Sequence, residues 1–287
     1  MSAPSFDPVQ YKTQQREGWD KVASGWRTWW ATFEHGGQAV SDRLVELARI
    51  QSGERVLDVA TGIGEPAVTA ARRVGPRGRV VATDLSNQML AIARARAAEL
   101  GLGNVEFRTM DAEAPDLPER TFDAVLCRWA LMFFPEPEAT LGALRRLMIP
   151  GGSLAVAVWD VGPKVPIISL RMNAMISVLG LAQPPPGTPG PFRLADPRHL
   201  ERMFTRAGFT GVRIERLTAV FDFESVESFT RFQREVGGPR VPTLAERPAE
   251  QRAKFWQAVA DGVRPYASAG DGSVRLPNEL ICVAARR

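Results

Sequence analysis

Residues 56–67 read "VLDVATGIGEPA", an apolar run that contains one acid and leads into two glycines with a single residue between them. A short continuous apolar run of this kind is typical of a buried strand. Gly62 and Gly64 let the next turn adopt positive φ, and they remove side chains that would hold a ligand away from the backbone. Pro66 suits the first turn of a helix, whose free N–H groups face the same place. The stretch therefore predicts a strand, a ligand-binding turn and a helix.

The first half of the chain repeats this alternation of strand and helix. Strands are predicted at 55–60, 79–84, 104–111, 122–129 and 153–160, with helices at 65–74, 86–102 and 136–148. Strands separated by helices of this length indicate parallel βαβ units, and hence an α/β, doubly wound sheet with helices on both faces. Ligands bind such sheets at the carboxyl ends of the strands, where the opening stretch has its glycines.

The pattern changes after residue 160. Strands at 211–223 and 278–287 are expected to extend the sheet, and helices at 165–180, 196–209, 225–237 and 249–263 are expected to form a cap. We therefore expect an N-terminal helical lid at 1–50, a core at 51–160, and helical cap insertions with the last two strands at 161–287.

Composition narrows the class of protein. The net charge of +4 comes from 36 basic and 32 acidic residues spread along the chain, which is the pattern of a solvated surface and argues against a nucleic-acid partner. No apolar stretch reaches the roughly 18 residues of a membrane span. Two distant cysteines form neither a disulfide framework nor a metal pattern, so we expect no metal and a cytoplasmic location. The oligomeric state is not indicated.

Acids at two further strand ends suggest what the turn binds. Asp84 follows Gly64 by 20 residues, the spacing at which an acid accepts hydrogen bonds from ribose hydroxyls, although it could instead help Ser86 to cap the next helix. Asp111 could accept from an exocyclic amino group and the Ala112 N–H could serve a ring nitrogen, which together match an adenine edge. Leu85 and Met89 could sandwich that ring, or could simply pack in the core.

The turn runs G-I-G-E-P-A, so a dinucleotide remains possible on spacing alone. Glu65 would repel a pyrophosphate, however, and Asp58 ends the same strand. Two acids here favour a ligand with a cationic group.

Four stretches together resemble the class I S-adenosylmethionine-dependent methyltransferases, in particular the branch of the ubiquinone/menaquinone-biosynthesis (type 11) enzymes that methylate small molecules. These are "VLDVATGIG", "VVATDLSNQML", "MDAEAPDLPERTFDAVLCRWALMFF" and "LRRLMIPGGSLAV", which occur in the family's order within residues 20–160. The resemblance implies a Rossmann-like seven-stranded sheet whose last strand is antiparallel, with S-adenosylmethionine as the cofactor.

The resemblance also implies where the cofactor lies. The methionine part is expected at Asp58, Thr61, Gly62 and Gly64, with Cys127 beside it mainly through its backbone. Asp84 is expected to hold the ribose. The adenine is expected at Asp111 and Ala112, with Leu85 and Met89 over its ring.

Aromatic residues suggest the substrate site. Trp26, Trp29, Trp30 and Phe33 share one face of a predicted helix, as a wall over the substrate or as core packing. After the fourth strand, Arg128 could hold a substrate oxygen or pair with a structural acid. Trp129, Phe133 and Phe134 fit a flat apolar substrate, or the core.

His35 is the candidate general base, although a lone histidine is often structural, and His199 is a weaker candidate. A base is needed only if the acceptor has a proton to lose. The sequence thus predicts methyl transfer to a carbon or oxygen of a small, apolar or aromatic molecule. The alternatives are an NAD-dependent oxidoreductase and a non-catalytic protein that binds S-adenosylmethionine.

Overall fold

The computed structural model describes residues 6–183, 185, 187–237 and 244–287. Its centre is a seven-stranded sheet with the order β3-β2-β1-β4-β5-β7-β6. The strands are β1 (Arg55–Val59), β2 (Arg79–Asp84), β3 (Val105–Thr109), β4 (Phe122–Arg128), β5 (Met148–Trp159), β6 (Thr210–Phe223) and β7 (Val274–Arg286). β1 to β5 are parallel, and β7 runs antiparallel to both of its neighbours. The predicted Rossmann-like sheet with an antiparallel last strand is confirmed.

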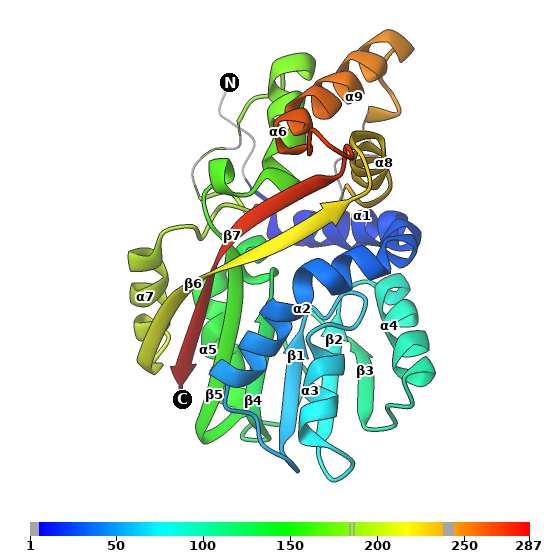
Figure 1. Cartoon of the computed structure of the whole chain (residues 1–287). Helices are drawn as coiled ribbons and strands as arrows, with labels where there is room; N and C mark the ends of the chain where they lie inside the picture. Colours follow the sequence, from blue (N-terminus) through cyan, green and yellow to red (C-terminus); the bar gives the residue numbers. More distant parts are fainter. Residues whose placement is uncertain (1–5, 184, 186, 238–243) are drawn as a thin grey trace.

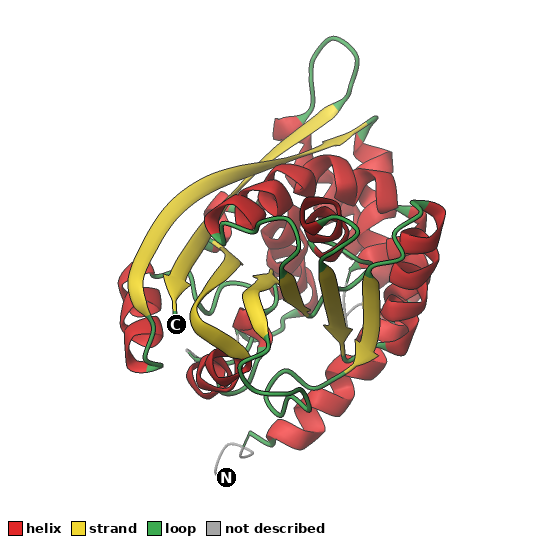
Figure 2. Ribbon diagram, turned by 90° about the horizontal axis from the view of Figure 1, so that it is seen from below, coloured by secondary structure: helices red, strands yellow, loops and turns green. Residues whose placement is uncertain are grey.

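Helices lie on both sides of the row of strands, as Figure 2 shows. They are α1 (Pro8–Thr28), α2 (Trp30–Leu47), α3 (Ala67–Val74), α4 (Asn87–Glu99), α5 (Pro137–Leu147), α6 (Pro166–Leu179), α7 (Pro197–Arg206), α8 (Val226–Val236) and α9 (Ala249–Val263). Short 3-10 helices follow β4, β5 and α9, at Leu131–Phe133, Gly162–Lys164 and Arg264–Tyr266.

The sequence explains most of these boundaries locally. Ser86 caps α4 because its hydroxyl accepts from the Met89 N–H at 3.0 Å, as the sequence predicts. Asp7 caps α1 in the same way, accepting from the N–H of Val9 at 2.9 Å. β1 is buried over four of its five residues, as an apolar strand in the middle of a parallel sheet must be. β5 begins at Met148, five residues before its predicted start, because α5 already ends at Leu147.

Four helices lie beyond the carboxyl ends of the parallel strands. α1 crosses this end of the sheet, with α6, α8 and α9 above it, while α2 and α3 lie in front of the strands (Figure 1). β6 and β7 extend past the other strands as a long antiparallel pair, registered from Thr210 opposite Arg286 to Phe223 opposite Val274. Because α8 and α9 are inserted between β6 and β7, this pair holds them above the sheet.

The N-terminal helices differ from the expected single helix at 25–35. α1 ends at Thr28 and α2 begins at Trp30, with Trp29 between them at φ −96° and ψ 18°. The chain turns here because α1 follows the upper edge of the sheet and α2 descends along it (Figure 1). The four aromatic residues therefore do not share one straight helical face.

Close approach of α1 to the cap depends on one glycine. A Cβ on Gly25 would lie 2.0 Å from the carbonyl oxygen of Glu235 in α8, and backbone cannot move aside cheaply. By contrast, a Cβ on Gly142 within α5 would meet nothing within 4 Å.

We predict that Gly25→Ala lowers the free energy of unfolding by about 1–3 kcal/mol, because overpacking forces α1 away from α8. The control Gly142→Ala should be neutral or stabilising by up to about 1 kcal/mol, since alanine favours helix. Urea unfolding of both variants measures these differences. Equal stability of the Gly25→Ala variant and the wild type would contradict the packing described here.

Candidate functional site

The turn after β1 has a backbone that only glycine adopts easily. Gly62 has φ 56° and Gly64 has φ 108°. A Cβ on Gly62 would meet nothing, whereas one on Gly64 would lie 3.3 Å from the Cβ of Ala93, so Gly64 also lets α4 approach. Ala60 (φ 55°) and Trp129 (φ 57°) hold left-handed conformations directly after β1 and β4. Such strain, of order 1–3 kcal/mol per residue, is concentrated at functional sites.

Asp58 lies fully buried beneath this turn. Its Oδ2 accepts from the Ala67 N–H at 2.9 Å, at the start of α3, while Oδ1 has no hydrogen-bond partner among the described residues. Burial raises the pKa of Asp58 to about 7, since it penalises the charged form, and the nearby Thr61 hydroxyl and then the Arg128 guanidinium oppose that rise. The free oxygen of this buried carboxyl can accept a hydrogen bond from a ligand or pair with a cationic group of it.

The same turn holds two more shielded polar atoms that have no hydrogen-bond partner among the described residues, Thr61 Oγ1 and Glu65 Oε1, although Glu65 Oε1 forms an ion pair with Arg96. Glu65 does not face the ligand space as the sequence argument assumed, because its carboxylate lies 3.5 Å from Arg96 Nη2 of α4 and accepts from the Thr69 hydroxyl. The preference for a cationic ligand therefore depends on Asp58 alone.

Asp84 connects the ends of β1 and β2. Its Oδ2 accepts from the Gly62 N–H at 2.8 Å and its Oδ1 from the Ser86 N–H at 2.9 Å. Burial raises the pKa of Asp84, and these two N–H groups partly offset the rise. Each carboxylate oxygen accepts more than one hydrogen bond, so both can also serve vicinal hydroxyls. Leu85 is half-buried next to it and Met89 is buried on α4.

α1 reaches over the remaining predicted cofactor residues, which the sequence did not indicate. Lys12 Nζ lies 2.6 Å from Asp111 Oδ2, and this hydrogen bond is the main reason that the pKa of Lys12 is raised. Asp111 Oδ1 accepts from the Glu113 N–H at 2.9 Å, with Ala112 buried between them. Asp20 of α1 accepts from the Ser86 hydroxyl at 2.6 Å. The N-terminal helix is thus fastened across the ends of β2 and β3.

Cys127 lies buried near the end of β4 and forms no disulfide. Burial raises the pKa of this thiol to about 12, so it is neutral at ordinary pH. Contact of its backbone with the cofactor stays a prediction.

A cavity of about 830 Å³ lies between α1, the ends of β4 and β5, and the cap. Two stacked pairs are part of its wall: Trp26 on Phe33, with ring centres 4.0 Å apart, and Trp129 on Trp159, 4.3 Å apart. Phe133 also lines it, in edge contact with Trp19 of α1. Trp26 and Phe33 of the predicted aromatic wall line this cavity, as do Trp129 and Phe133, and their contact with a substrate stays a prediction.

Two other predicted wall residues lie elsewhere. Trp29 is buried and donates from Nε1 to Glu235 Oε2 of α8 at 2.6 Å, and Trp30 lies against Arg96, whose Cζ is 3.3 Å from the ring centre. Neither side chain lines the cavity. The reason is the break at Trp29, which turns these two rings away from Trp26 and Phe33.

Arg128 also turns away from the cavity. Its Nη1 donates to the Gly37 carbonyl at 3.2 Å and to the Ser41 hydroxyl at 2.8 Å, both in α2. The predicted contact with substrate is replaced by this buried structural one.

His35 lies on the surface of α2, with 72% of its side chain exposed, and faces Asp222 at 3.3 Å. It is not among the cavity-lining residues, and exposed His199 on α7 is not either. The proposed base is therefore corrected: this geometry brings no histidine to the site.

Arg171 of α6 and Gln233 of α8 are lining residues that sequence reasoning missed. Each has a shielded polar atom without a hydrogen-bond partner in the described chain, as does Trp129. Only the packing of the cap brings them to the cavity, so no local signal could have found them.

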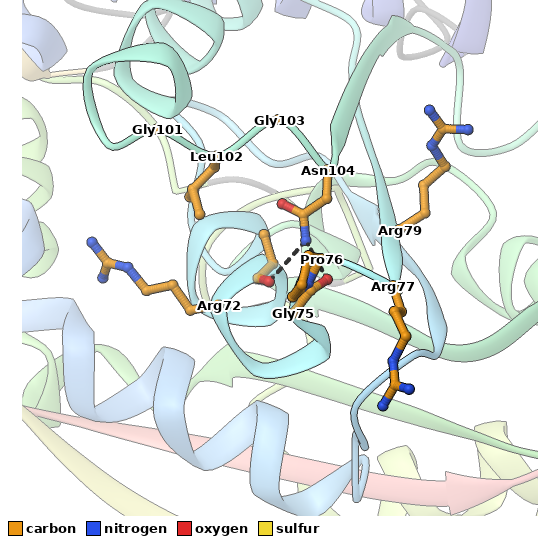
Figure 3. A pocket seen from close by; sticks show the side chains of 11 residues that line it. Arg72, Gly75, Pro76, Arg77, Arg79, Gly101, Leu102, Gly103 and Asn104 are labelled. Atoms are coloured by element: carbon orange, nitrogen blue, oxygen red, sulfur yellow. Dashed lines mark hydrogen bonds between the residues drawn. The ribbon is translucent and has the colours of Figure 1, made fainter.

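A second hollow, of about 590 Å³, lies at the opposite edge of the sheet, where β2 and β3 begin. Figure 3 shows Arg72, Arg77 and Arg79 pointing away from one another. Asn104 uses its amide to bind the carbonyls of Ala71 and Gly75, at 2.9 and 3.0 Å (Figure 3). This hollow is a loop junction rather than a site.

Among the described residues, no three His, Cys, Asp or Glu side chains lie close enough together to bind a metal ion. None of the described helices combines the length and the apolar character that a membrane span requires.

A family model described as a methyltransferase domain matches residues 56–152. The ubiquinone/menaquinone biosynthesis C-methyltransferase UbiE of Pseudomonas putida is 34% identical over 138 residues, which are 48% of this chain and 50% of that protein. The aklanonic acid methyltransferase DauC of a Streptomyces species is 33% identical over 149 residues, 50% of this chain and 64% of its own. The chain thus spans about half to two thirds of the length of these relatives.

A solved structure of phosphoethanolamine N-methyltransferase 2 from Haemonchus contortus, in complex with S-adenosylmethionine, matches with a TM-score of 0.60 at 18% identity. The match covers 99% of this chain and 60% of the solved protein's chain, and at this identity it supports the fold alone. Residues 56–152 thus match a methyltransferase domain, and over this core the chain is similar to the UbiE branch of the S-adenosylmethionine-dependent enzymes, which supports S-adenosylmethionine as the cofactor.

We predict that the buried carboxyl of Asp58 makes stability depend on pH. Its folded-state pKa of about 7 exceeds its unfolded value of 3.8, so the folded protein binds the proton more tightly. The free energy of unfolding should therefore fall as pH rises from about 4 to 7 and stay level above, by up to a few kcal/mol in total.

Urea unfolding of Asp58→Asn against wild type across this range measures the effect. The variant should be the more stable protein above pH 7, and the difference should close toward pH 4. A difference that instead grows as the pH falls would mean that the carboxylate is stabilised in its charged form.

Proposed function

We propose that this chain transfers a methyl group from S-adenosylmethionine to a carbon or oxygen of a small, apolar or aromatic molecule. The observation that carries the proposal is the aromatic cavity at the carboxyl ends of β4 and β5, the edge of the sheet at which the glycine turn after β1 also lies. Cavities of this size, mostly apolar with a few polar groups, are typical of small-molecule sites. The names of the two relatives, a quinone-pathway C-methyltransferase and an aklanonic acid methyltransferase, support a small organic acceptor.

The residues of the glycine turn fit the cofactor that the family uses. The unpartnered Asp58 Oδ1 and Thr61 Oγ1, with the open backbone at Gly62 and Gly64, suit its amino acid part. Asp84 suits the ribose hydroxyls and Asp111 with Ala112 suits the adenine edge, while Leu85, Met89 and the Cys127 backbone complete the surroundings. When bound, S-adenosylmethionine supplies a methyl group on a positive sulfur, which keeps the bonding electron pair as the acceptor bond forms.

The protein's own part is to orient the acceptor and exclude water. Holding reacting atoms about 3–3.5 Å apart can lower a barrier by roughly 7–11 kcal/mol. Trp26, Phe33, Trp129 and Phe133 are the walls that would hold a flat acceptor. The cavity lining within the described residues includes no Asp, Glu or His, so it favours an acceptor that is already nucleophilic, such as an ionised oxygen or an electron-rich carbon.

Two other readings remain as alternatives. An NAD-dependent oxidoreductase shares the glycine turn and the ribose acid, and a non-catalytic protein could bind S-adenosylmethionine through the same residues. We also propose a cytoplasmic location, supported by two free, buried cysteines, and a small-molecule rather than nucleic-acid partner, supported by the dispersed charge.

Calorimetric titration tests the cofactor residues. Asp84→Ala should weaken binding of S-adenosylmethionine and S-adenosylhomocysteine by about 1.5–3 kcal/mol, the usual cost of a lost hydrogen bond to a charged group. The matched control is Asp123→Ala, because the Asp123 carboxylate also accepts from a backbone N–H, that of Arg55 at 2.8 Å, but at the opposite edge of the sheet. It should leave affinity unchanged. Binding of NAD alone would overturn the proposal.

Turnover tests the reaction. With methyl-labelled S-adenosylmethionine and a panel of phenols, quinols, aromatic acids and amines, we expect label in a carbon- or oxygen-methylated product. Fragmentation of that product by mass spectrometry locates the methyl group. Label transferred only to amines would contradict the acceptor class. Tight cofactor binding with no transfer to any acceptor would favour the non-catalytic reading.

A further inference from the structure

Arg171 is a cation in the cavity wall with no counterion among the described residues. It lies on α6 and lines the cavity, and its Nε is shielded from solvent without a hydrogen-bond partner in the described chain. Burial lowers its pKa to about 10, so it stays charged at neutral pH. A shielded polar atom of this kind needs an explanation.

Arg193, the second arginine that lines the cavity, has hydrogen-bond partners. Arg193 Nη1 donates to the carbonyls of Phe134 and Pro135, at 2.6 and 3.1 Å. Burial lowers its pKa, while Glu136, Tyr11 and Glu113 act in the opposite direction. Arg193 therefore fastens the loop after β4. Among the described residues, Arg171 has no such hydrogen bond and no carboxylate within ion-pair distance.

The neighbours of Arg171 form a polar end to an otherwise apolar cavity. Gln233 of α8 donates from Nε2 to the Ile167 carbonyl at 2.7 Å, one helical turn before Arg171 on α6. The Oε1 of Gln233 is shielded and without a partner among the described residues. Trp19 and Phe133 meet in another part of the lining, between α1 and the loop after β4. The cavity wall thus combines Arg171 and Gln233 of the cap with aromatic rings beside the ends of β4 and β5.

We propose that Arg171 binds a carboxylate on the substrate, anchoring the acid group in the cap so that the rest of the molecule points toward the end of β4. This deepens the proposed function by naming the substrate class as an aromatic or apolar carboxylic acid. A guanidinium matches a carboxylate with two parallel hydrogen bonds, and a desolvated pair of this kind is strong. One unbalanced cation matches one negative charge, whereas a phosphate monoester brings nearly two.

Binding of probe molecules without turnover tests the proposal, so it does not depend on methyl transfer. The probes are 2-naphthoate, its neutral methyl ester and 2-naphthyl phosphate, followed by quenching of tryptophan fluorescence. The wild type should bind naphthoate about 10- to 100-fold more tightly than the ester. Arg171→Met should remove this preference while binding of the ester stays within about twofold.

Two further variants separate charge from cavity shape. Ile168→Ala changes an apolar lining residue of the same helix, so it should weaken acid and ester by the same factor and keep the preference. Arg171→Lys retains the charge without the planar fork, so its preference should be intermediate. The proposal is overturned if the wild type binds the ester as tightly as the acid, if Arg171→Met keeps the preference, or if the phosphate binds more tightly than the carboxylate. Loss of methyl transfer in the turnover assay with this preference intact would count against the proposed reaction alone.

Discussion

The hydrogen bond from the Gly62 N–H to the Asp84 carboxylate ties the turn after β1 to the end of β2, and the site is built outward from it. The other oxygen of Asp84 holds the Ser86 N–H at the start of α4, and the Ser86 hydroxyl reaches Asp20 of α1. The Asp84 carboxylate therefore links the glycine turn to the start of α4, and through Ser86 to α1. Since this carboxylate is the one proposed to bind the ribose, cofactor binding and the position of α1 are coupled through a few contacts.

Unsatisfied polar atoms mark the two halves of the site. Six of the eight shielded atoms without partners in the described chain belong either to the glycine turn or to the cavity. Of the first group, Asp58 and Thr61 lie where a cofactor with an amino group is expected, whereas Glu65 forms an ion pair with Arg96. The second group, on Trp129, Arg171 and Gln233, lies where a substrate is expected. Buried polar groups are normally paired, so these atoms are the places where the proposed cofactor and substrate would supply partners.

Sequence patterns were most informative where chemistry is local. Glycine spacing, the acid 20 residues later and the Ser86 cap all depend on residues close together in the chain, and the structure has each element where it was expected. The aromatic stripe was less informative, because it assumed a straight helix that breaks at Trp29. Arg128 and His35 were plausible by residue type alone, yet one bonds to α2 and the other faces solvent.

The sequence by itself determined the βαβ alternation, and with it the edge of the sheet at which ligands bind, because hydrophobic period and turn chemistry act over a few residues. Only the tertiary structure decided which aromatic rings face the cavity, that Lys12 covers Asp111, and that Arg171 has no counterion among the described residues. These depend on how α1, α6 and α8 pack above the sheet, and so on segments far apart in the chain, 99 residues for Lys12 and Asp111 and 66 for Ile167 and Gln233. Side-chain direction at such contacts is set by the partner surface, which no local pattern contains.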